Sequence, residues 1–236
     1  MFTGIVETTG EIISFTKGMG AARLTIAAPA IAARLRTGDS VAVNGVCLTA
    51  LEIEAGAVPP RFSADLAAET IARTTLSRLG AGSVVNLELP TPAGAPLGGH
   101  VVQGHVDGVG TLLALERVSK AAESDWVLRI QLPEGMARYV VKKGSISVEG
   151  ISLTVAGMEG DAIWIAILPH TYAATNLHTL KPGMGVNLEV DVLAKYAESR
   201  AKGDAVRREL TVEYLLPHSP YARRSRLPWQ TGFRQR

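Results

Sequence analysis

One stretch of the chain occurs twice, and this repetition limits the possible folds more than any other feature. Residues 40–50, SVAVNGVCLTA, return as residues 145–155, SISVEGISLTV. Each copy is an alternating run rich in β-branched side chains, and a glycine interrupts both copies at the same place. The pattern predicts two short strands joined by a tight turn.

Three shorter blocks repeat in the same order. They pair Gly4-Ile5-Val6 with Gly104-His105-Val106, residues 69–76 with 170–177, and residues 85–88 with 186–189. Four matching blocks in one order indicate a duplicated domain with a period of about 100 residues. The 236 residues are therefore expected to form two small domains and a C-terminal extension.

Short, evenly spaced strands are expected within both domains. We predict strands over 1–13, 23–28 and 84–89 in the first copy and from residues 101, 126, 145, 163 and 186 in the second. Short helices are expected at 29–36 and 66–71. Antiparallel strands of this kind favour a mainly all-β fold with one small closed barrel in each half. The proline- and glycine-rich stretch 90–96 marks the boundary, which gives domains over 1–95 and 96–191.

The pattern changes near Val192, where residues at helical spacing begin. Positions 192, 196, 199, 203, 206 and 210 predict an amphipathic helix, although Gly203 is a poor residue for it. We assign this helix and its extension to 192–216. Residues 217–236 carry five arginines, three prolines and no acidic residue. Such a tail can contact nucleic acid, but its prolines prevent a continuous basic helix and favour a solvated extension.

The remaining composition indicates a cytoplasmic protein that is not inserted in a membrane. The chain has one cysteine, which excludes an internal disulfide and fits a reducing compartment. Its first residues lack the basic start and apolar core of a signal peptide. No uninterrupted apolar run approaches the ~20 residues that a membrane helix needs.

Few residues have the chemistry or spacing of a reactive centre. His100 and His105, placed on one strand, would point to opposite faces, so we predict no metal site. His105 takes the place of Ile5, which suits either a functional or a surface position. Cys47, whose counterpart is Ser152, is by itself best interpreted as a small buried side chain.

The polar residues beside these positions have two interpretations each. Thr49 and Thr154 either serve a ligand or close their turns. Glu69-Thr70 and His170-Thr171 begin short helices, where they either cap the helix or lie beside N–H groups that bind a polar ligand. The residues alone therefore predict two similar, polar-lined pockets on a duplicated barrel.

Longer motifs make the prediction more specific. They are MFTGIVE at 1–7, NGVCLT at 44–49, GGHVVQGHVDG at 98–108, GISLT at 150–154, LPHT at 168–171 and VNLEVDVLAKY at 186–196. In these motifs the chain resembles riboflavin synthase (alpha chain), in order and in both repeats, over residues 1 to about 198. Glu149 departs from the aspartate expected there, and the match ends near Ser199.

The resemblance implies a fold, an assembly and a reaction. It implies two tandem six-stranded Greek-key barrels, each binding a lumazine, followed by a C-terminal helix through which a homotrimer forms. Two molecules of 6,7-dimethyl-8-ribityllumazine would react in each site without a cofactor. A four-carbon unit would pass from one to the other, giving riboflavin and 5-amino-6-ribitylaminouracil. Two stacked copies of one substrate need two similar pockets face to face. Lumazine synthase is a further partner that the resemblance suggests.

The resemblance also assigns the site residues. The first pocket would use Cys47, Leu48, Thr49, Asp65, Leu66, Ala67, Ala68, Glu69 and Thr70. The second would use Ser152, Leu153, Thr154, Ala166, Ile167, Leu168, Pro169, His170 and Thr171, with Lys143 nearby. The segments Gly4-Ile5-Val6 and Gly104-His105-Val106 would each close the facing pocket.

Three of these residues are candidates for the chemistry, namely His105, Ser40 and Cys47, with water as a competing nucleophile. The alternative function is that of the lumazine and yellow fluorescent proteins, similar duplicated barrels that hold a ligand without converting it. Such binders are expected to lose pocket residues in one repeat. Cys47, Thr70, Ser152 and Thr171 are all present, and the enzyme is therefore favoured.

Overall fold

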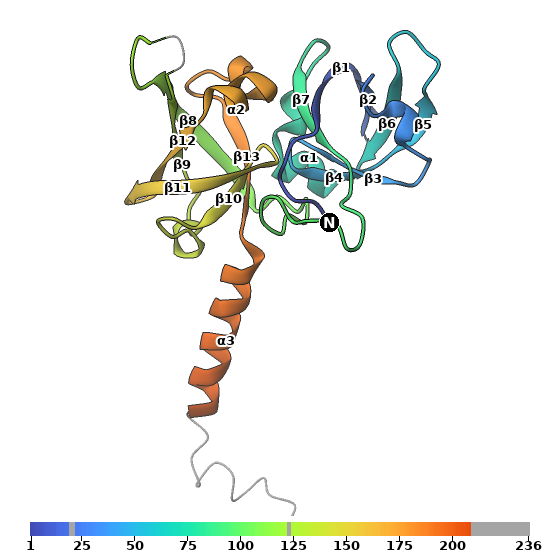
Figure 1. The fold of residues 1–236 in the computed structure, drawn as a ribbon. Helices are drawn as coiled ribbons and strands as arrows, with labels where there is room; N and C mark the ends of the chain where they lie inside the picture. The colour runs from blue at the N-terminus through green and yellow to red at the C-terminus, as the bar shows by residue number, and fades with distance from the viewer. Residues whose placement is uncertain (19–21, 122–123, 209–236) are drawn as a thin grey trace, which may run out of the picture. The chain divides into compact units, whose positions relative to one another are not determined.

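The computed structural model describes residues 1–18, 22–121 and 124–208, with side chains as far as residue 201. Residues 1–194 form one compact unit, and a second unit begins at Lys195. The first unit contains two halves with the same succession of strands and short helices (Figure 1).

The first half is a sheet that closes through a single chain segment. Its strands are β1 (Thr8–Lys17), β2 (Ala22–Ala27), β3 (Ser40–Val43), β4 (Val46–Thr49), β5 (Leu51–Glu54), β6 (Arg61–Leu66) and β7 (Val84–Glu88). They lie in the order β4-β3-β7-β1-β2-β6-β5. Only Ala50 separates β4 from β5, so the two ends of the sheet are consecutive parts of one bent strand. The result is a six-stranded barrel.

The second half is a closed barrel in which the bent strand is continuous. Its strands are β8 (Gly108–Arg117), β9 (Trp126–Gln131), β10 (Ser145–Val148), β11 (Ile151–Glu159), β12 (Ala162–Ile167) and β13 (Gly185–Val190). They lie in the order β10-β11-β12-β9-β8-β13. Because β9 returns to lie beside β12, the far strand of a three-strand meander, the connection is a Greek key. The predicted pair of Greek-key barrels is confirmed.

Each barrel encloses its own apolar core. In both halves the strands alternate between buried and exposed positions, as a sheet with one buried face requires. Leu24, Phe62 and Leu87 are fully buried in the first core, and Leu128 and Ile165 are fully buried in the second. The alternation predicted from the repeat therefore decides which side chains face inward.

Both copies of the repeated segment form hairpins with a two-residue turn. Asn44 and Gly45 have φ values of 47° and 77°, and Glu149 and Gly150 have 51° and 79°. Two successive residues with positive φ match the twist of a β-hairpin, and Asn-Gly is a favoured pair for this turn. Val43 pairs with Val46 across the first turn.

Short helices follow at equivalent places in the two halves. They are α1 (Ala68–Arg73) and the 3₁₀ helices η1 (Ala32–Arg34) and η2 (Thr75–Arg78) in the first half, and α2 (Pro169–Ala174), η3 (Ala137–Tyr139) and η4 (Asn176–Thr179) in the second. The helix predicted at 66–71 thus begins two residues later, and the one predicted at 29–36 is a single 3₁₀ turn.

Two predicted strands are wrong at their beginnings. β1 begins at Thr8 rather than at Met1, and β8 begins at Gly108 rather than at Val101. The segments before them are extended but belong to neither sheet, and Phe2 pairs with Val102 in an isolated bridge instead. An extended segment has the same apolar alternation whether it joins a sheet or leaves it, so the pattern could not separate the two.

The predicted C-terminal helix is present as α3 (Val192–Arg208). Tyr196 is 67% exposed in this helix. The predicted seam residue Leu210 and the basic tail 217–236 lie outside the described residues. None of the described helices has the length and apolar character needed to cross a membrane.

Candidate active site

The two segments that precede the barrels cross from one barrel to the other. The carbonyl oxygen of Gly4 accepts a hydrogen bond of 2.7 Å from the amide of Ser152, in the second barrel. The carbonyl oxygen of Gly104 accepts one of 2.9 Å from the amide of Cys47, in the first barrel. A Cβ at Gly104 would lie 2.6 Å from the Cβ of Cys47. These contacts fix each crossing segment against the repeated hairpin of the opposite barrel.

The exchange of segments extends into the apolar cores. Val6 packs against the core of the second barrel, and Val106 packs against the core of the first. Each barrel therefore needs the crossing segment of the other half to complete it. Gly4-Ile5-Val6 and Gly104-His105-Val106 thus lie against the opposite repeat, and their closing of a facing pocket stays a prediction.

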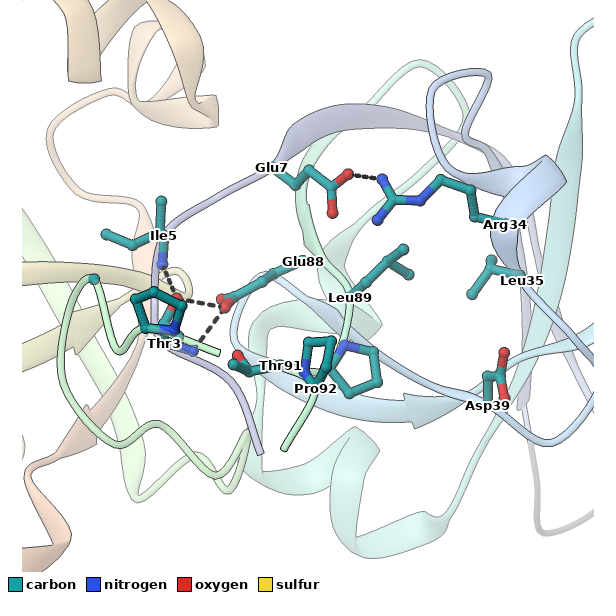
Figure 2. Close-up of a pocket in the computed structure, with 13 residues that line it drawn as sticks. Thr3, Ile5, Glu7, Arg34, Leu35, Asp39, Glu88, Leu89, Thr91 and Pro92 are labelled. Atoms are coloured by element: carbon teal, nitrogen blue, oxygen red, sulfur yellow. Dashed lines mark hydrogen bonds and ion pairs between the residues drawn. The ribbon is translucent and has the colours of Figure 1, made fainter. Parts of the chain in front are cut away.

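Two buried carboxylates hold the crossing segments by their main chains. Glu88 accepts hydrogen bonds from the amides of Thr3 and Gly4 at 2.6 and 3.0 Å, and Figure 2 shows its carboxylate directed at Thr3. Glu189 accepts from the amides of Gln103 and Gly104 at 2.7 and 2.9 Å. Burial raises the pKa of both carboxyls, and the N–H donors act against this rise.

A cavity of about 360 Å³ lies where the second crossing segment meets the first barrel. Its lining contains six residues predicted for the site, namely Cys47, Glu69, Thr70, Gly104, His105 and Val106. Four further residues, Val46, Arg73, Thr74 and Asp107, line it and were not predicted. The first predicted pocket thus brings together the hairpin, the start of α1 and the crossing segment. His105 is exposed and Cys47 is half-buried.

The first turn of α1 lines this cavity with Glu69 and Thr70. The residue before the helix, Ala67, makes no side-chain capping bond, so the capping interpretation of this segment is not supported. Glu69 instead pairs with Arg73 at 2.8 Å along the helix. The Thr70 carbonyl accepts a 2.7 Å hydrogen bond from the Thr74 hydroxyl. The first-turn N–H groups of a helix are suited to a polar ligand edge.

His100, which was considered as a metal ligand but not included among the predicted site residues, lies against Ser152 of the second barrel. The Nδ1 atom of His100 lies 2.7 Å from the Oγ atom of Ser152. The His100 side chain is 8% exposed, and its Nε2 atom makes no hydrogen bond with the described residues. Burial lowers the pKa of His100, and Asp191 acts in the opposite direction. A neutral ring beside a hydroxyl can exchange a proton with it.

Aromatic side chains flank the second pocket but not the first. Trp126 and Tyr172 stack with ring centroids 3.9 Å apart. Tyr172 follows Thr171 in α2, and Trp126 pairs with Ile167 in β12. In the first barrel the corresponding strand pair joins Ala22 to Leu66, which provides no flat surface. The two barrels thus have similar backbones here but differ in their side chains.

Other predicted residues divide into core and surface positions. Leu48, Leu66, Leu153 and Ile167 are buried in the two cores, so only their main chains can meet a ligand. Thr49, Thr154, Lys143, Asp65, Ala166, Leu168 and His170 are exposed. Ser40 is half-buried and pairs with Thr49 across the first hairpin.

Figure 2 shows another cavity, of about 600 Å³, which shares no lining residue with the cavity beside Cys47. The buried Thr3–Glu88 contact and the ion pair of Glu7 with Arg34 form part of its wall. Ile5 is its one lining residue among those predicted for the site. Neither Ser152 nor Thr171 lines it.

Comparison with known proteins identifies the family. A family model described as "Lumazine binding domain" matches residues 3–90 and again 103–191. Riboflavin synthase of Mycobacterium bovis is 48% identical over 84% of this chain and 96% of its own length. The chain belongs to the riboflavin synthase family. The corresponding enzyme of Actinobacillus pleuropneumoniae is 38% identical over 91% of this chain and 98% of its own length.

Solved structures agree with this membership of the riboflavin synthase family. The crystal structure of LumP complexed with riboflavin is 28% identical, covers 80% of this chain and 99% of LumP, and superposes with a TM-score of 0.73. LumP complexed with 6,7-dimethyl-8-(1'-D-ribityl) lumazine gives a TM-score of 0.70 at 27% identity. The resemblance predicted from the motifs is confirmed.

Among the described residues of this riboflavin synthase-family chain, we find no group of three or more His, Cys, Asp or Glu side chains that could bind a metal ion. His100 and His105 do not share a strand as predicted, because both lie in the crossing region before β8. His100 contacts Ser152 in the second barrel, whereas His105 lines the cavity beside Cys47 in the first.

Proposed function

We propose that this chain is a riboflavin synthase that converts two molecules of 6,7-dimethyl-8-ribityllumazine into riboflavin and 5-amino-6-ribitylaminouracil. One molecule donates a four-carbon unit, and the other accepts it. Because a single substrate fills both roles, the reaction balances without an oxidant or a cofactor. Relatives named riboflavin synthase support this assignment, as do LumP structures complexed with the lumazine and with riboflavin.

One observation carries the proposal. Cys47, Thr70 and His105, which lie on three distant segments, line one cavity, and the second barrel repeats the hairpin hydroxyl and the helix start as Ser152 and Thr171. His105 is exposed and lines this cavity, so a contribution to the barrel core does not explain its presence. Two equivalent pockets fit a reaction between two copies of one molecule.

We assign some residues to substrate binding and others to proton transfer. Main-chain groups of the hairpin and of the helix start would hold the pyrimidinedione edge of each substrate, and hydroxyls would hold the ribityl chain. The acceptor must lose a proton from its C7 methyl group, and the donor must gain a nucleophile at C7. His105 is our candidate for the proton transfer, and Cys47 and Ser40 are candidates to assist the nucleophile. Stacking the rings in reacting geometry supplies much of the acceleration.

The complete reaction chamber would be built between chains. We propose a homotrimer, held partly through α3, in which the first barrel of one chain faces the second barrel of the next. Beside the second pocket Ile5 is 52% exposed and Leu168 is 61% exposed. Apolar surface at such a place is more stable when a partner covers it. We also expect the enzyme in the cytoplasm and an association with lumazine synthase, which co-sedimentation of the two proteins would test.

The direct test is to incubate the protein with 6,7-dimethyl-8-ribityllumazine and follow the appearance of flavin absorbance. Formation of riboflavin and of 5-amino-6-ribitylaminouracil in equal amounts would support the assignment. Tight binding of the lumazine without turnover would instead favour the alternative function, a non-catalytic binder. The polar residues retained in both pockets favour the enzyme.

A further inference from the structure

A third cavity, of about 460 Å³, lies between the two barrels and shares no lining residue with the cavity beside Cys47. Equivalent segments of the two repeats form most of its lining, and the two hairpin turns contribute Asn44 and Glu149. The segments provide Thr75, Arg78, Leu79, Gly82, Ser83 and Val84 from the first repeat and Asn176, Thr179, Leu180, Gly183, Met184 and Gly185 from the second. None of the residues proposed above for catalysis lines it. Its volume falls in the range of small-molecule sites.

The cavity is shaped by one difference between the repeats. In the second repeat, Asn176 accepts a hydrogen bond from the Asn86 side chain at 2.9 Å and donates one to Glu149 at 2.9 Å. The equivalent residue of the first repeat is Thr75, which is shorter. Its amide donates to Asn187 at 2.8 Å, in the same way as the Asn176 amide donates to Asn86. Its side chain reaches none of the equivalent partners.

The Thr75 hydroxyl is therefore a buried group with its hydrogen-bonding capacity unused. Thr75 is 5% exposed, and its Oγ1 atom has no hydrogen-bond partner among the described residues. A buried hydroxyl without a partner is energetically unfavourable. Thr75 lines the cavity, so a rotation of its side chain would let the hydroxyl donate to a molecule bound there.

A positive charge lies on the same side of the cavity as the methyl group of Thr75. Arg78 makes no hydrogen bond or ion pair with any side chain in the described ranges, and its guanidinium lies over Gly185 of the other repeat. A Cβ added to Gly185 would be 2.6 Å from the Arg78 Nη1 atom and 3.5 Å from the Thr75 Cγ2 atom. The guanidinium and the threonine thus approach one point, within reach of a single ligand group.

The remaining wall is suited to an anion with an apolar body. Leu79, Leu180 and Met184 provide apolar surface. The Glu149 carboxylate already accepts hydrogen bonds from the Asn187 amide and the Asn176 side chain. We propose that the inter-barrel cavity binds a small organic anion, whose phosphate or carboxylate pairs with Arg78 and accepts a hydrogen bond from Thr75.

The test uses phenyl phosphate as the probe and isothermal titration calorimetry of the full chain. Inorganic phosphate tests the anionic group alone, and benzyl alcohol tests the apolar body alone. Benzoate tests whether a carboxylate can replace the phosphate. We expect phenyl phosphate or benzoate to bind at least ~10-fold more tightly than either fragment, since both contacts are then made. No binding of any probe at about 10 mM would overturn the proposal and leave a water-filled cavity.

Variants then locate the binding. Arg78→Gln and Thr75→Asn, which introduces the residue of the second repeat, should each weaken the probe by ~10-fold or more, and Arg78→Lys should weaken it less. Arg36→Gln, which removes an exposed arginine elsewhere, is the matched control. Lumazine turnover should stay unchanged in all four proteins and shows that they are folded. Equal probe affinity in Arg78→Gln and wild type, or displacement of the probe by the lumazine, would contradict a separate inter-barrel site.

Discussion

Gly45 and Gly150 lie directly against each other where the two hairpins meet. A Cβ at Gly45 would lie 2.7 Å from the Gly150 nitrogen, and one at Gly150 would lie 2.6 Å from the Gly45 nitrogen. Contacts this short do not occur between real Cβ and nitrogen atoms, so neither turn has room for a side chain. The repeated segment is thus both the hairpin of each barrel and the surface by which the barrels touch.

Replacing either glycine with alanine should therefore destabilise the pair of barrels. We expect Gly45→Ala and Gly150→Ala each to lower the free energy of unfolding by more than the ~1 kcal/mol that a left-handed alanine costs, as measured by urea denaturation. Gly38→Ala is the matched control, because Gly38 has a φ of 96° with open space around it. Equal losses at Gly38 and Gly45 would show that backbone strain, not the contact, is responsible.

Glu149 should make stability depend on pH. It is 2% exposed, and burial raises its pKa from 4.5 to about 7, although the Asn187 amide and the Asn176 side chain donate to the ionised form. The folded protein then holds this proton more tightly than the unfolded chain does. Its stabilising contribution is present below pH 4.5 and is lost as pH rises to about 7. We expect a fall of order 1–3 kcal/mol across this window.

The Glu149→Asn variant isolates this effect, since asparagine is the residue of the first repeat at this turn. Glu88 and Glu189 also have raised pKa values, so the wild type and the variant share their contributions. The difference between the two urea-unfolding profiles should slope only between about pH 4.5 and 7. A flat difference would mean that Glu149 stays ionised throughout.

The two barrels could be predicted because the same pattern of strands and turns occurs twice in the sequence. The alternation in 40–50 and 145–155 specified both hairpins, and His170-Thr171 lie in the first turn of α2, where a short helix was expected to begin. The course of the crossing segments could not be predicted in this way. Gly4 and Gly104 bond to residues far away in the sequence, and periodicity is a local signal.

The site was predicted where the repeats match and missed where they do not. Cys47, Thr70 and His105 had counterparts in the other copy, and they line one cavity. His100 precedes the repeated block, whose first matched residues are Gly4 and Gly104. Its bond to Ser152 depends on the chain between the domains folding back onto the second hairpin. The glycines of the motif Gly98-Gly99-His100 are the sequence feature that could have indicated this contact. A Cβ at Gly99 would lie 2.8 Å from the Cβ of Ser152, so the close approach requires a glycine there.

His105→Gln should lower turnover by about 10²-fold or more if His105 moves protons. Glutamine keeps the size and a polar edge, so lumazine binding should change much less. His178→Gln is a control, since His178 is exposed and bonds to the main chain of Thr175. Steady-state kinetics and a separate fluorescence titration of the lumazine would check this. Turnover at the wild-type rate would remove His105 from the mechanism.

Cys47→Ser should fold normally and keep appreciable activity, because serine is the residue of the second repeat at this place. The variant retains the 2.9 Å bond from the residue 47 amide to Gly104, which involves only the main chain. Retained activity would indicate a polar contact. Complete loss of turnover with unchanged lumazine affinity would point to chemistry that needs the thiol.

The proposal that reaction chambers form between chains has the sharpest test. Thr70 lines the first pocket and Thr171 holds the equivalent place in the second. A buried, unpaired charge against a flat ring should prevent binding, so Thr70→Arg should disable only first pockets and Thr171→Arg only second pockets. Each variant alone should be inactive, since every chamber would then contain one disabled pocket.

Mixed oligomers of the two variants should regain part of the activity. The intact first barrel of a Thr171→Arg chain would face the intact second barrel of a Thr70→Arg chain, which restores one complete chamber. Co-expression with two different affinity tags and sequential purification would isolate such oligomers for the flavin assay. Chambers built within one chain could not be rescued, because every chain carries one disabled pocket. Inactive mixed oligomers, with both single variants folded by circular dichroism, would rule out the chamber between chains.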